Sequence, residues 1–171
     1  HRSVWTVEPG PRELAPGQDR FDVKLTATGP AGDRIVQTLT FRRGSYLIDA
    51  TFEVSNAAAA PVSPFAYFQL TRDTKYAVPQ NQMAPANYVG PVVYNAVDNF
   101  KKIEPGEIDK LAADPNRKLP YQRNADNGWI GMIEHYFVAA WLPSDEQKVA
   151  REFYARKLDG GLYAAGVIVP L

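Results

Sequence analysis

Glu134 and His135 adjoin within the stretch GWIGMIEHYFVAAWLP (residues 128–143), and a carboxylate with an imidazole is a common general acid–base combination. Adjacent residues of a strand point to opposite faces, so on a strand these two side chains cannot form one dyad. The sequence has only one other histidine, His1 at the terminus, which excludes a His-rich metal centre. We therefore interpret His135 as a core or interface histidine.

Other motifs that carry chemistry are weak or missing. The segment NADNG (residues 124–128) resembles a calcium loop only loosely, because its glycine falls at the wrong offset and no bidentate glutamate follows. The sequence contains no Gly-rich phosphate loop and no G-x-S-x-G motif. It has no cysteine, which excludes disulfides, thiolate zinc sites and a cysteine nucleophile. We expect no enzymatic activity and no cofactor.

The charge balance excludes further classes of partner. Lys plus Arg and Asp plus Glu each number 19 in a chain of 171 residues. A nucleic-acid-binding protein needs a basic surplus to neutralise phosphates, so we expect no nucleic-acid partner. No polybasic run suggests an anionic membrane surface, and no apolar run is long enough to span a bilayer.

The segment 88–102 carries residues suited to binding another protein. Pro91 has no N–H to donate, which predicts that the strand YVGPVVYN lies at a sheet edge or contains a bulge. An edge strand can accept a partner's strand, and aromatic side chains supply contact area at low entropy cost. The alternative is an edge that is only protected against aggregation. The candidate partner-binding residues are Tyr88, Pro91, Tyr94, Phe100, Lys101 and Lys102, together with His135 of the neighbouring segment.

Alternating apolar and polar residues predict strands along most of the chain, separated by turns rich in Gly and Pro. One short helix is expected at residues 105–113, and a long loop at residues 72–86. This pattern is typical of an all-β sandwich. The expected strands are residues 20–28, 34–41, 46–54, 65–71, 88–95, 151–158 and 162–169.

The stretch 128–143 fits both a helix and a strand. Apolar residues recur at helical spacing, and the length favours a helix. Aromatic and β-branched residues dominate, however, and a helix would be weakened by Gly131. We predict one long strand, bent near His135, with Trp129 and Trp141 on one face and largely buried.

Several of these segments together resemble the large periplasmic domain of the YidC family of bacterial membrane protein insertases. The resemblance is carried by GPVVYN (residues 90–95), FKKI (100–103) and the string GW…M…HYF..AW.P within residues 128–143. The segment TLTFRRGSYLIDATFEVSN (38–56) also resembles that domain, as does LYAAG (162–166). The similar segments occur in the same order and run along nearly the whole chain.

The resemblance implies a β-supersandwich similar to galactose mutarotase-like domains, with one or two short helices. Residues 1–171 would then form a single periplasmic domain, cut from a longer membrane protein and tethered to the inner membrane by helices absent from this chain. The whole protein would insert and fold inner-membrane proteins, alone or with the Sec translocon and SecDF. The insertion chemistry would belong to the transmembrane bundle.

These observations leave two functions open. The first is a non-catalytic interaction or scaffold domain that contacts SecDF, the Sec translocon or nascent inner-membrane proteins. The alternative is a carbohydrate- or peptide-binding module that uses a cleft of the sandwich. Mutarotase-type catalysis needs acid and base groups on both sides of the sugar, and His135 alone does not provide them.

Overall fold

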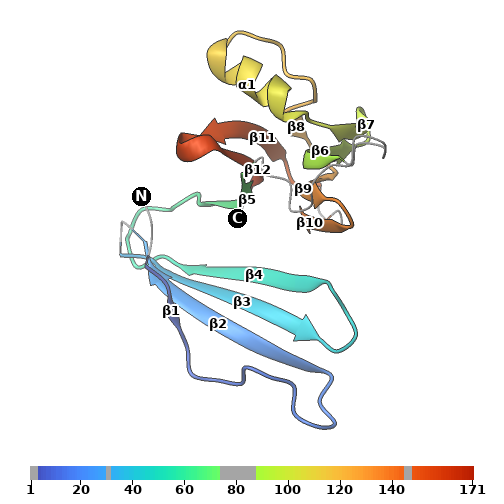
Figure 1. Ribbon diagram of the computed structural model, residues 1–171. Coiled ribbons are helices and arrows are strands. Elements are labelled where there is room, and N and C mark those ends of the chain that lie inside the picture. The colour runs from blue at the N-terminus through green and yellow to red at the C-terminus, as the bar shows by residue number, and fades with distance from the viewer. Residues whose placement is uncertain (1–3, 30–31, 74–87, 145–147) are drawn as a thin grey trace. The chain divides into compact units, whose positions relative to one another are not determined.

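The computed structural model describes residues 4–29, 32–73, 88–144 and 148–171, and the chain divides into two compact units, His1–Ser63 and Pro64–Leu171. The described residues form three antiparallel four-stranded sheets and one α-helix, which confirms the predicted all-β class (Figure 1). The prediction of a single domain stays a prediction.

The first unit is a single sheet, sheet I, with the strand order β1-β2-β3-β4. Its register aligns Phe21, Phe41 and Ile48 across three strands, and most other apolar positions of these strands follow at every second residue. One face is therefore mainly apolar, although it includes Gln37, and the buried Val36 lies on the opposite face. The strands are β1 (Thr6–Val7), β2 (Arg20–Thr28), β3 (Arg34–Arg42) and β4 (Ile48–Ser55).

The second unit contains two sheets that pack on each other. Sheet II has the order β10-β9-β6-β7 and sheet III the order β5-β12-β11-β8. The ring of Phe68 in sheet III lies 4.8 Å from that of Trp141 in sheet II, centroid to centroid, which places the two sheets in contact. Their strands are β5 (Phe65–Arg72), β6 (Val89–Asn95), β7 (Asn99–Lys102), β8 (Asn124–Ala125), β9 (Trp129–Glu134), β10 (Phe137–Trp141), β11 (Arg151–Leu158) and β12 (Leu162–Pro170).

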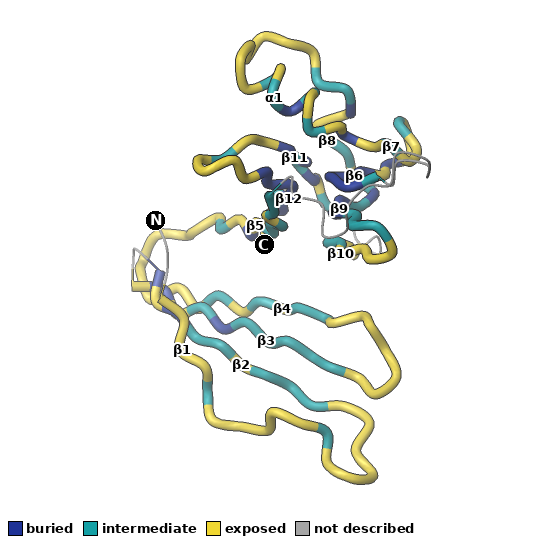
Figure 2. Tube along the Cα trace, viewed as in Figure 1, coloured by how far each residue is buried: buried dark blue, intermediate teal, exposed yellow. Residues whose placement is uncertain are grey.

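The buried core of the described chain is concentrated in this second unit (Figure 2). Its fully buried side chains come from both sheets and from the helix α1 (Pro105–Ala113), which inserts Ile108. Close packing of this kind makes each of them sensitive to loss of volume. They include Val92, Val93, Ile103, Ile108, Ile130, Phe153 and Val167.

Most predicted elements are confirmed to within a residue or two. The helix occupies the predicted residues 105–113, and β11 and β12 are joined by the predicted glycine turn, Asp159–Gly161. Tyr46 was expected inside a strand, but it precedes β4 and is fully exposed. The predicted long loop at 72–86 begins inside β5, and its residues 74–86 lie outside the described residues.

The stretch 128–143 is neither a helix nor one long strand. It forms the antiparallel hairpin of β9 and β10, which reverses at His135 and Tyr136. His135 has a φ of 53°, a left-handed conformation that turns usually assign to Gly or Asn. The prediction of one bent strand was therefore wrong, although the bend was placed at the right residue.

The hairpin also separates the two tryptophans that were expected on one face. Trp141 pairs with Ile130, which is the neighbour of Trp129, so Trp129 and Trp141 lie on opposite faces of sheet II. Both side chains are half-buried instead of largely buried. The prediction of a shared, buried face was wrong because it assumed a continuous strand.

Candidate partner-binding site

Three aromatic side chains form a row across sheet II. Tyr94 of β6 pairs directly with Phe100 of β7 on one side and with Trp129 of β9 on the other. The ring centroid of Trp129 lies 6.2 Å from that of Tyr94 and 6.2 Å from that of Phe100. Tyr94 is 39% exposed and Phe100 47% exposed. We call these three residues the aromatic ladder.

The aromatic ladder reaches the edge of its sheet through β7. Among the described strands, β7 pairs only with β6, so its outer backbone groups face away from the sheet. β7 itself was not among the expected strands, which in this segment covered residues 88–95 only. The predicted proximity of the segment 88–102 to the stretch containing Trp129 is confirmed by the pairing of β6 with β9.

Pro91 lies neither at an edge nor at a bulge, because β6 pairs on both sides and its register with β9 is continuous through Pro91. The prediction made from its missing N–H was therefore wrong. Pro91 belongs to β6, an interior strand between β9 and β7, and its side chain is fully buried. The carbonyl oxygen of Pro91 accepts the N–H of Ile103 at 2.9 Å, just beyond the last residue of β7. Because the polar groups of alternate residues point to opposite sides of a strand, the missing N–H faces Ile103 and leaves the ladder with β9 intact.

The hydroxyl of Tyr88 lies within hydrogen-bond reach of the carbonyl oxygens of both Pro91 and Ile103, beside the N–H that Pro91 lacks. This hydroxyl lies 3.0 Å from the carbonyl oxygen of Ile103 and 3.1 Å from the N–H of the same residue. Gly90 makes room for this arrangement, since a Cβ there would meet the Tyr88 hydroxyl at 2.8 Å. Burial, reinforced by the negative charge of Glu104, holds the pKa of Tyr88 well above its usual value. Tyr88 is thus half-buried and structural, not an exposed aromatic of an edge.

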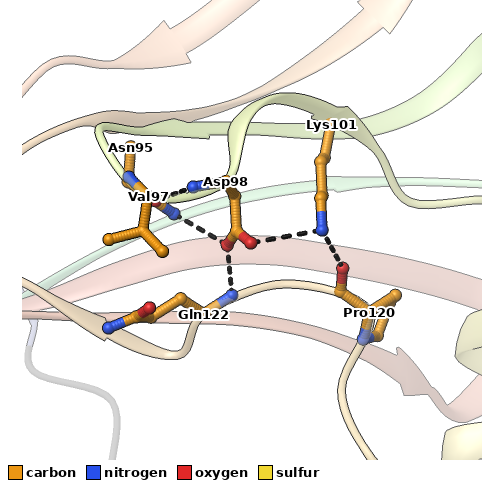
Figure 3. A network of polar contacts seen from close by, with 6 residues as sticks. All are labelled: Asn95, Val97, Asp98, Lys101, Pro120 and Gln122. Carbon is orange, nitrogen blue, oxygen red and sulfur yellow. Dashed lines mark hydrogen bonds and ion pairs between the residues drawn. The ribbon is translucent and has the colours of Figure 1, made fainter.

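The two lysines of the candidate surface are engaged within the unit. Lys101 lies 3.2 Å from the carboxylate of Asp98 and donates to the carbonyl oxygen of Pro120 at 3.0 Å (Figure 3). The ammonium of Lys102 lies 4.9 Å from the centre of the Tyr88 ring, a cation–π distance. Lys102 is exposed and Lys101 half-buried, so Lys102 presents its charge to solvent beside the aromatic ladder.

The turn between β6 and β7 is fixed by a polar network around Asn95 and Asp98 (Figure 3). The side-chain oxygen of Asn95, which is fully buried, accepts the N–H groups of Val97 at 3.0 Å and Asp98 at 2.7 Å. Asp98 in turn accepts hydrogen bonds from the Asn95 amide at 3.1 Å and from the backbone N–H of Gln122. The network therefore connects the β6–β7 hairpin, which carries Tyr94 and Phe100, to the backbone at Gln122.

Electrostatics keep the carboxylate of Asp98 ionised. Burial alone would raise its pKa, but the hydrogen bonds from Gln122, Asn95 and Lys101, with the positive charge of Lys101, outweigh that effect and lower the pKa. The negative charge is consequently a permanent part of the turn at neutral pH.

His135 lies apart from the aromatic ladder. In the register of β6 and β9, Glu134 pairs with Val89 at one end of the strands and Trp129 pairs with Tyr94 at the other. The imidazole packs against Tyr136, with 3.7 Å between ring centroids, while Glu134 forms an ion pair with Arg72 at 3.0 Å. The sheet therefore brings Tyr94, Phe100 and Lys102 together, and leaves His135 at the opposite end.

A hollow that was not predicted from the sequence lies on sheet III. It has a volume of about 430 Å³ and carries aromatic and charged side chains on one face of the sheet. Tyr154 lies over Gly166, where a Cβ would meet its hydroxyl at 2.4 Å, and bonds to Gln69 at 3.1 Å. The hollow is lined by Tyr67, Leu119, Tyr121, Arg123, Glu152, Tyr154, Ala155, Arg156 and Ile168.

Charge in this hollow is mostly paired. Arg123 forms two hydrogen bonds to the carboxylate of Glu152, one of them at 2.8 Å. Arg156 donates to Gln69 at 3.2 Å, and its guanidinium lies 5.1 Å from the Tyr154 ring. The only signal for this hollow in the sequence was alternation within each strand. It places Tyr67 and Gln69 on the same face of β5, and Tyr154 and Arg156 on the same face of β11.

The described residues offer little to a catalytic centre. No cluster of His, Asp and Glu side chains within them could hold a metal ion. Among the helices that the structure describes, none combines the length and apolar character needed to cross a membrane. Among the described residues, the aromatic ladder with its strand edge and the hollow on sheet III are two features that can act on another molecule.

Comparison with known proteins gives one consistent family. The sequence model of the YidC periplasmic domain matches residues 1–171. The chain is 46% identical over 171 residues to the membrane protein insertase YidC of Nitrosospira multiformis, covering 100% of the chain and 28% of that protein. It is 41% identical over 172 residues to the protein of the same name from Nitrosomonas eutropha, covering 99% of the chain and 26% of the relative. The protein of that name from Aromatoleum aromaticum is 37% identical over 171 residues, with 100% and 30% covered.

Proposed function

Because this chain belongs to the YidC periplasmic-domain family, we propose that it is a non-catalytic interaction module of a membrane protein insertase. Family membership places it in the periplasm, as part of an inner-membrane protein. The chain spans between about a quarter and a third of its relatives' length. The insertion and folding of inner-membrane proteins therefore enter this proposal as the work of a full-length protein.

The single observation that carries the proposal is the exposed aromatic ladder at the free edge of β7. Edge strands offer unpaired backbone groups to which a partner can add a strand. Tyr94 and Phe100 are partly exposed beside those groups, where rigid rings supply contact area with little loss of entropy. The cation of Lys102 next to them favours a partner with an acidic surface and acts mainly on the association rate. The partners we propose are SecDF and the Sec translocon.

The ladder also accounts for residues that a merely protected edge would not need. Edges are usually protected by charges, by proline or by short strands. β7 is short and carries the exposed Lys102, but it also carries an exposed phenyl ring at Phe100. A phenyl ring at an edge invites association, so binding explains it better than protection does.

The proposal is tested by measuring binding to the periplasmic part of SecDF with a Tyr94→Ala, Phe100→Ser double variant. We expect the affinity to fall by about tenfold or more, because aromatic anchors dominate interface energies. The matched control is Tyr46→Ala, which removes a fully exposed tyrosine of the first unit and should leave binding unchanged. Wild-type affinity in a double variant that keeps its thermal stability would rule out the ladder as the docking site.

The hollow on sheet III supports a second candidate function, carbohydrate or peptide binding. Its volume of about 430 Å³ suits a small ligand, and Tyr67 and Tyr154 offer ring faces beside Arg156. Titration of the labelled chain with oligosaccharides and with unfolded peptides, followed by NMR, tests it. Ligand-dependent shifts confined to Tyr67, Tyr154 and their neighbours would support this function, and no shifts at millimolar ligand would eliminate it.

A further inference from the structure

The reversal between β9 and β10 exposes three large side chains in succession. Tyr136 is 85% exposed, Phe137 77% and Val138 63%. Phe137 and Val138 point to opposite faces of the hairpin, since they are consecutive strand residues. Exposure on both faces means that this end of the hairpin projects past the covered part of sheet II. We call residues 135–138 the hairpin tip.

The hairpin tip lies within a stretch that lacks permanent charge. Residues 135–143, HYFVAAWLP, contain no Asp, Glu, Lys or Arg. Glu134, at the base of the tip, is neutralised by Arg72, whose guanidinium lies 3.0 Å from its carboxylate. The tip therefore combines a phenol, a phenyl ring, an imidazole and an isopropyl group with no fixed charge. Such amphipathic and apolar rings are the side chains that favour the interface between water and lipid.

We propose that the hairpin tip inserts Tyr136, Phe137 and Val138 into the headgroup region of a phospholipid bilayer. The domain is part of an inner-membrane protein, so a bilayer surface is present beside it. The tip exposes only three large side chains in succession, whereas a stable protein interface uses about 20–30 residues on each side. A fluid headgroup layer can surround these three side chains without a surface of complementary shape.

The chemistry also sets the strength and salt dependence of this contact. Insertion of these three side chains is less favourable than insertion of one myristoyl chain, which by itself gives an association constant of only about 10⁴ M⁻¹. The contact is therefore weak in a free domain and becomes substantial when the domain is tethered to the membrane. The net charge of the chain is zero, so salt should change the contact little.

The absence of cysteine allows a direct measurement of depth. A nitroxide is attached to Tyr136→Cys, or to the control Val97→Cys, in a chain tethered through a C-terminal histidine tag to phosphatidylethanolamine–phosphatidylglycerol vesicles that contain a nickel-chelating lipid. Val97 is 67% exposed in the turn at the other end of the same sheet. We expect vesicles to protect the probe at 136 from water-soluble chromium oxalate and to increase its contact with oxygen. The probe at 97 should stay accessible to chromium oxalate.

Two substitutions in the untethered chain test how much the tip contributes to partition into vesicles. Phe137→Ser should lower the partition into vesicles by about tenfold, which is the effect of losing one inserted aromatic ring. The matched control Phe65→Ser removes a ring that is 64% exposed elsewhere in the second unit and should leave partition unchanged. Thermal unfolding shows that each variant is folded.

Three results would overturn the proposal. One is a probe at 136 that remains as accessible to chromium oxalate with tethered vesicles as without them. Another is a folded Phe137→Ser variant that partitions like the wild type. The third is protection of the probe at 136 without lipid, at concentrations where sedimentation shows dimers, which would assign the tip to a second copy of the chain.

Discussion

The hydroxyl of Tyr88 lies 3.0 Å from the carbonyl oxygen of Ile103, in the place where the N–H of Pro91 would be if that residue were not proline. We predict that Tyr88→Phe lowers the free energy of unfolding by about 1–3 kcal/mol, because it leaves a buried carbonyl oxygen without a donor. Urea denaturation followed by fluorescence measures the loss.

The Pro91→Ala background provides the control for this prediction. Alanine restores an N–H that faces Ile103, so Tyr88→Phe should cost less in that background than in the wild type. Equal costs in the two backgrounds would show that the Tyr88 hydroxyl does not substitute for the missing N–H.

Asp98 should make the stability of the second unit depend on acid pH. Its pKa is lowered in the folded chain, so its contribution is complete above the unfolded-state pKa of about 3.9 and is lost as the pH falls through the lower folded-state value. Asp98→Asn should therefore destabilise the chain near pH 7, and the difference from the wild type should shrink below pH 4.

Urea denaturation of both proteins between pH 7 and pH 2 checks this expectation. The control is Asp159→Asn, a change at an exposed residue of the turn between β11 and β12. If the stability difference between Asp98→Asn and the wild type stayed constant down to pH 2, the assignment of the acid transition to Asp98 would be wrong.

Gly166 should tolerate no side chain. A Cβ at this residue would lie 2.3 Å from the carbonyl oxygen of Phe68 and 2.4 Å from the Tyr154 hydroxyl, and the first of these groups is backbone in the neighbouring strand. We predict that Gly166→Ala costs about 1–3 kcal/mol or more through overpacking. Gly106→Ala is the matched control, since its Cβ meets nothing within 4 Å in α1 and alanine favours a helix.

The melting temperatures of the two glycine variants test whether a side chain at residue 166 destabilises the fold. Gly166→Ala should melt well below the wild type, and Gly106→Ala at or above it. A neutral Gly166→Ala would mean that the backbone of β5 at Phe68 and the ring of Tyr154 can both move away from residue 166 without cost.

Trp141 should tolerate phenylalanine far better than alanine. Its ring packs on Phe68 between the sheets, and its buried indole N–H has no acceptor among the described residues. Trp141→Ala should cost about 2–3 kcal/mol, less than the deletion of a fully buried aromatic side chain, because Trp141 is half-buried. Trp141→Phe keeps an aromatic contact and removes the unsatisfied N–H, so its cost should stay under about 1.5 kcal/mol. Equal losses in urea denaturation would contradict this account.

The sequence predicted the strands well where alternation is strict and turns contain glycine. β2 and β11 follow that rule, because their apolar or buried residues alternate and glycine marks the turn after each strand. The hairpin at His135 was missed because a histidine holds the left-handed position there, and no composition rule points to a turn. The same error assigned Trp129 and Trp141 to one face of the sheet. A reversal of the chain at residues 135 and 136 changes the face on which each later residue lies.

The candidate site was predicted only in part, for a related reason. Tyr94, Phe100 and Lys102 do lie together, because neighbouring strands bring their side chains to one face. Pro91 was assigned to an edge from its own chemistry, whereas its position depends on a hydroxyl from Tyr88. The hollow on sheet III joins segments far apart in the chain, and alternation within one segment cannot show what lies beside it.

Sheet III pairs β5, the first strand of the second unit, with β12, the last one, residue by residue from Phe65 opposite Pro170 to Arg72 opposite Tyr163. A chain that crosses a membrane from its amino end therefore delivers β5 long before its pairing strand. Contacts so distant in sequence slow folding, since a long loop must close first. Until β12 arrives, Phe65 and Tyr67 stand on an unpaired strand, which is the state in which the unit is most exposed to proteases and to misassociation.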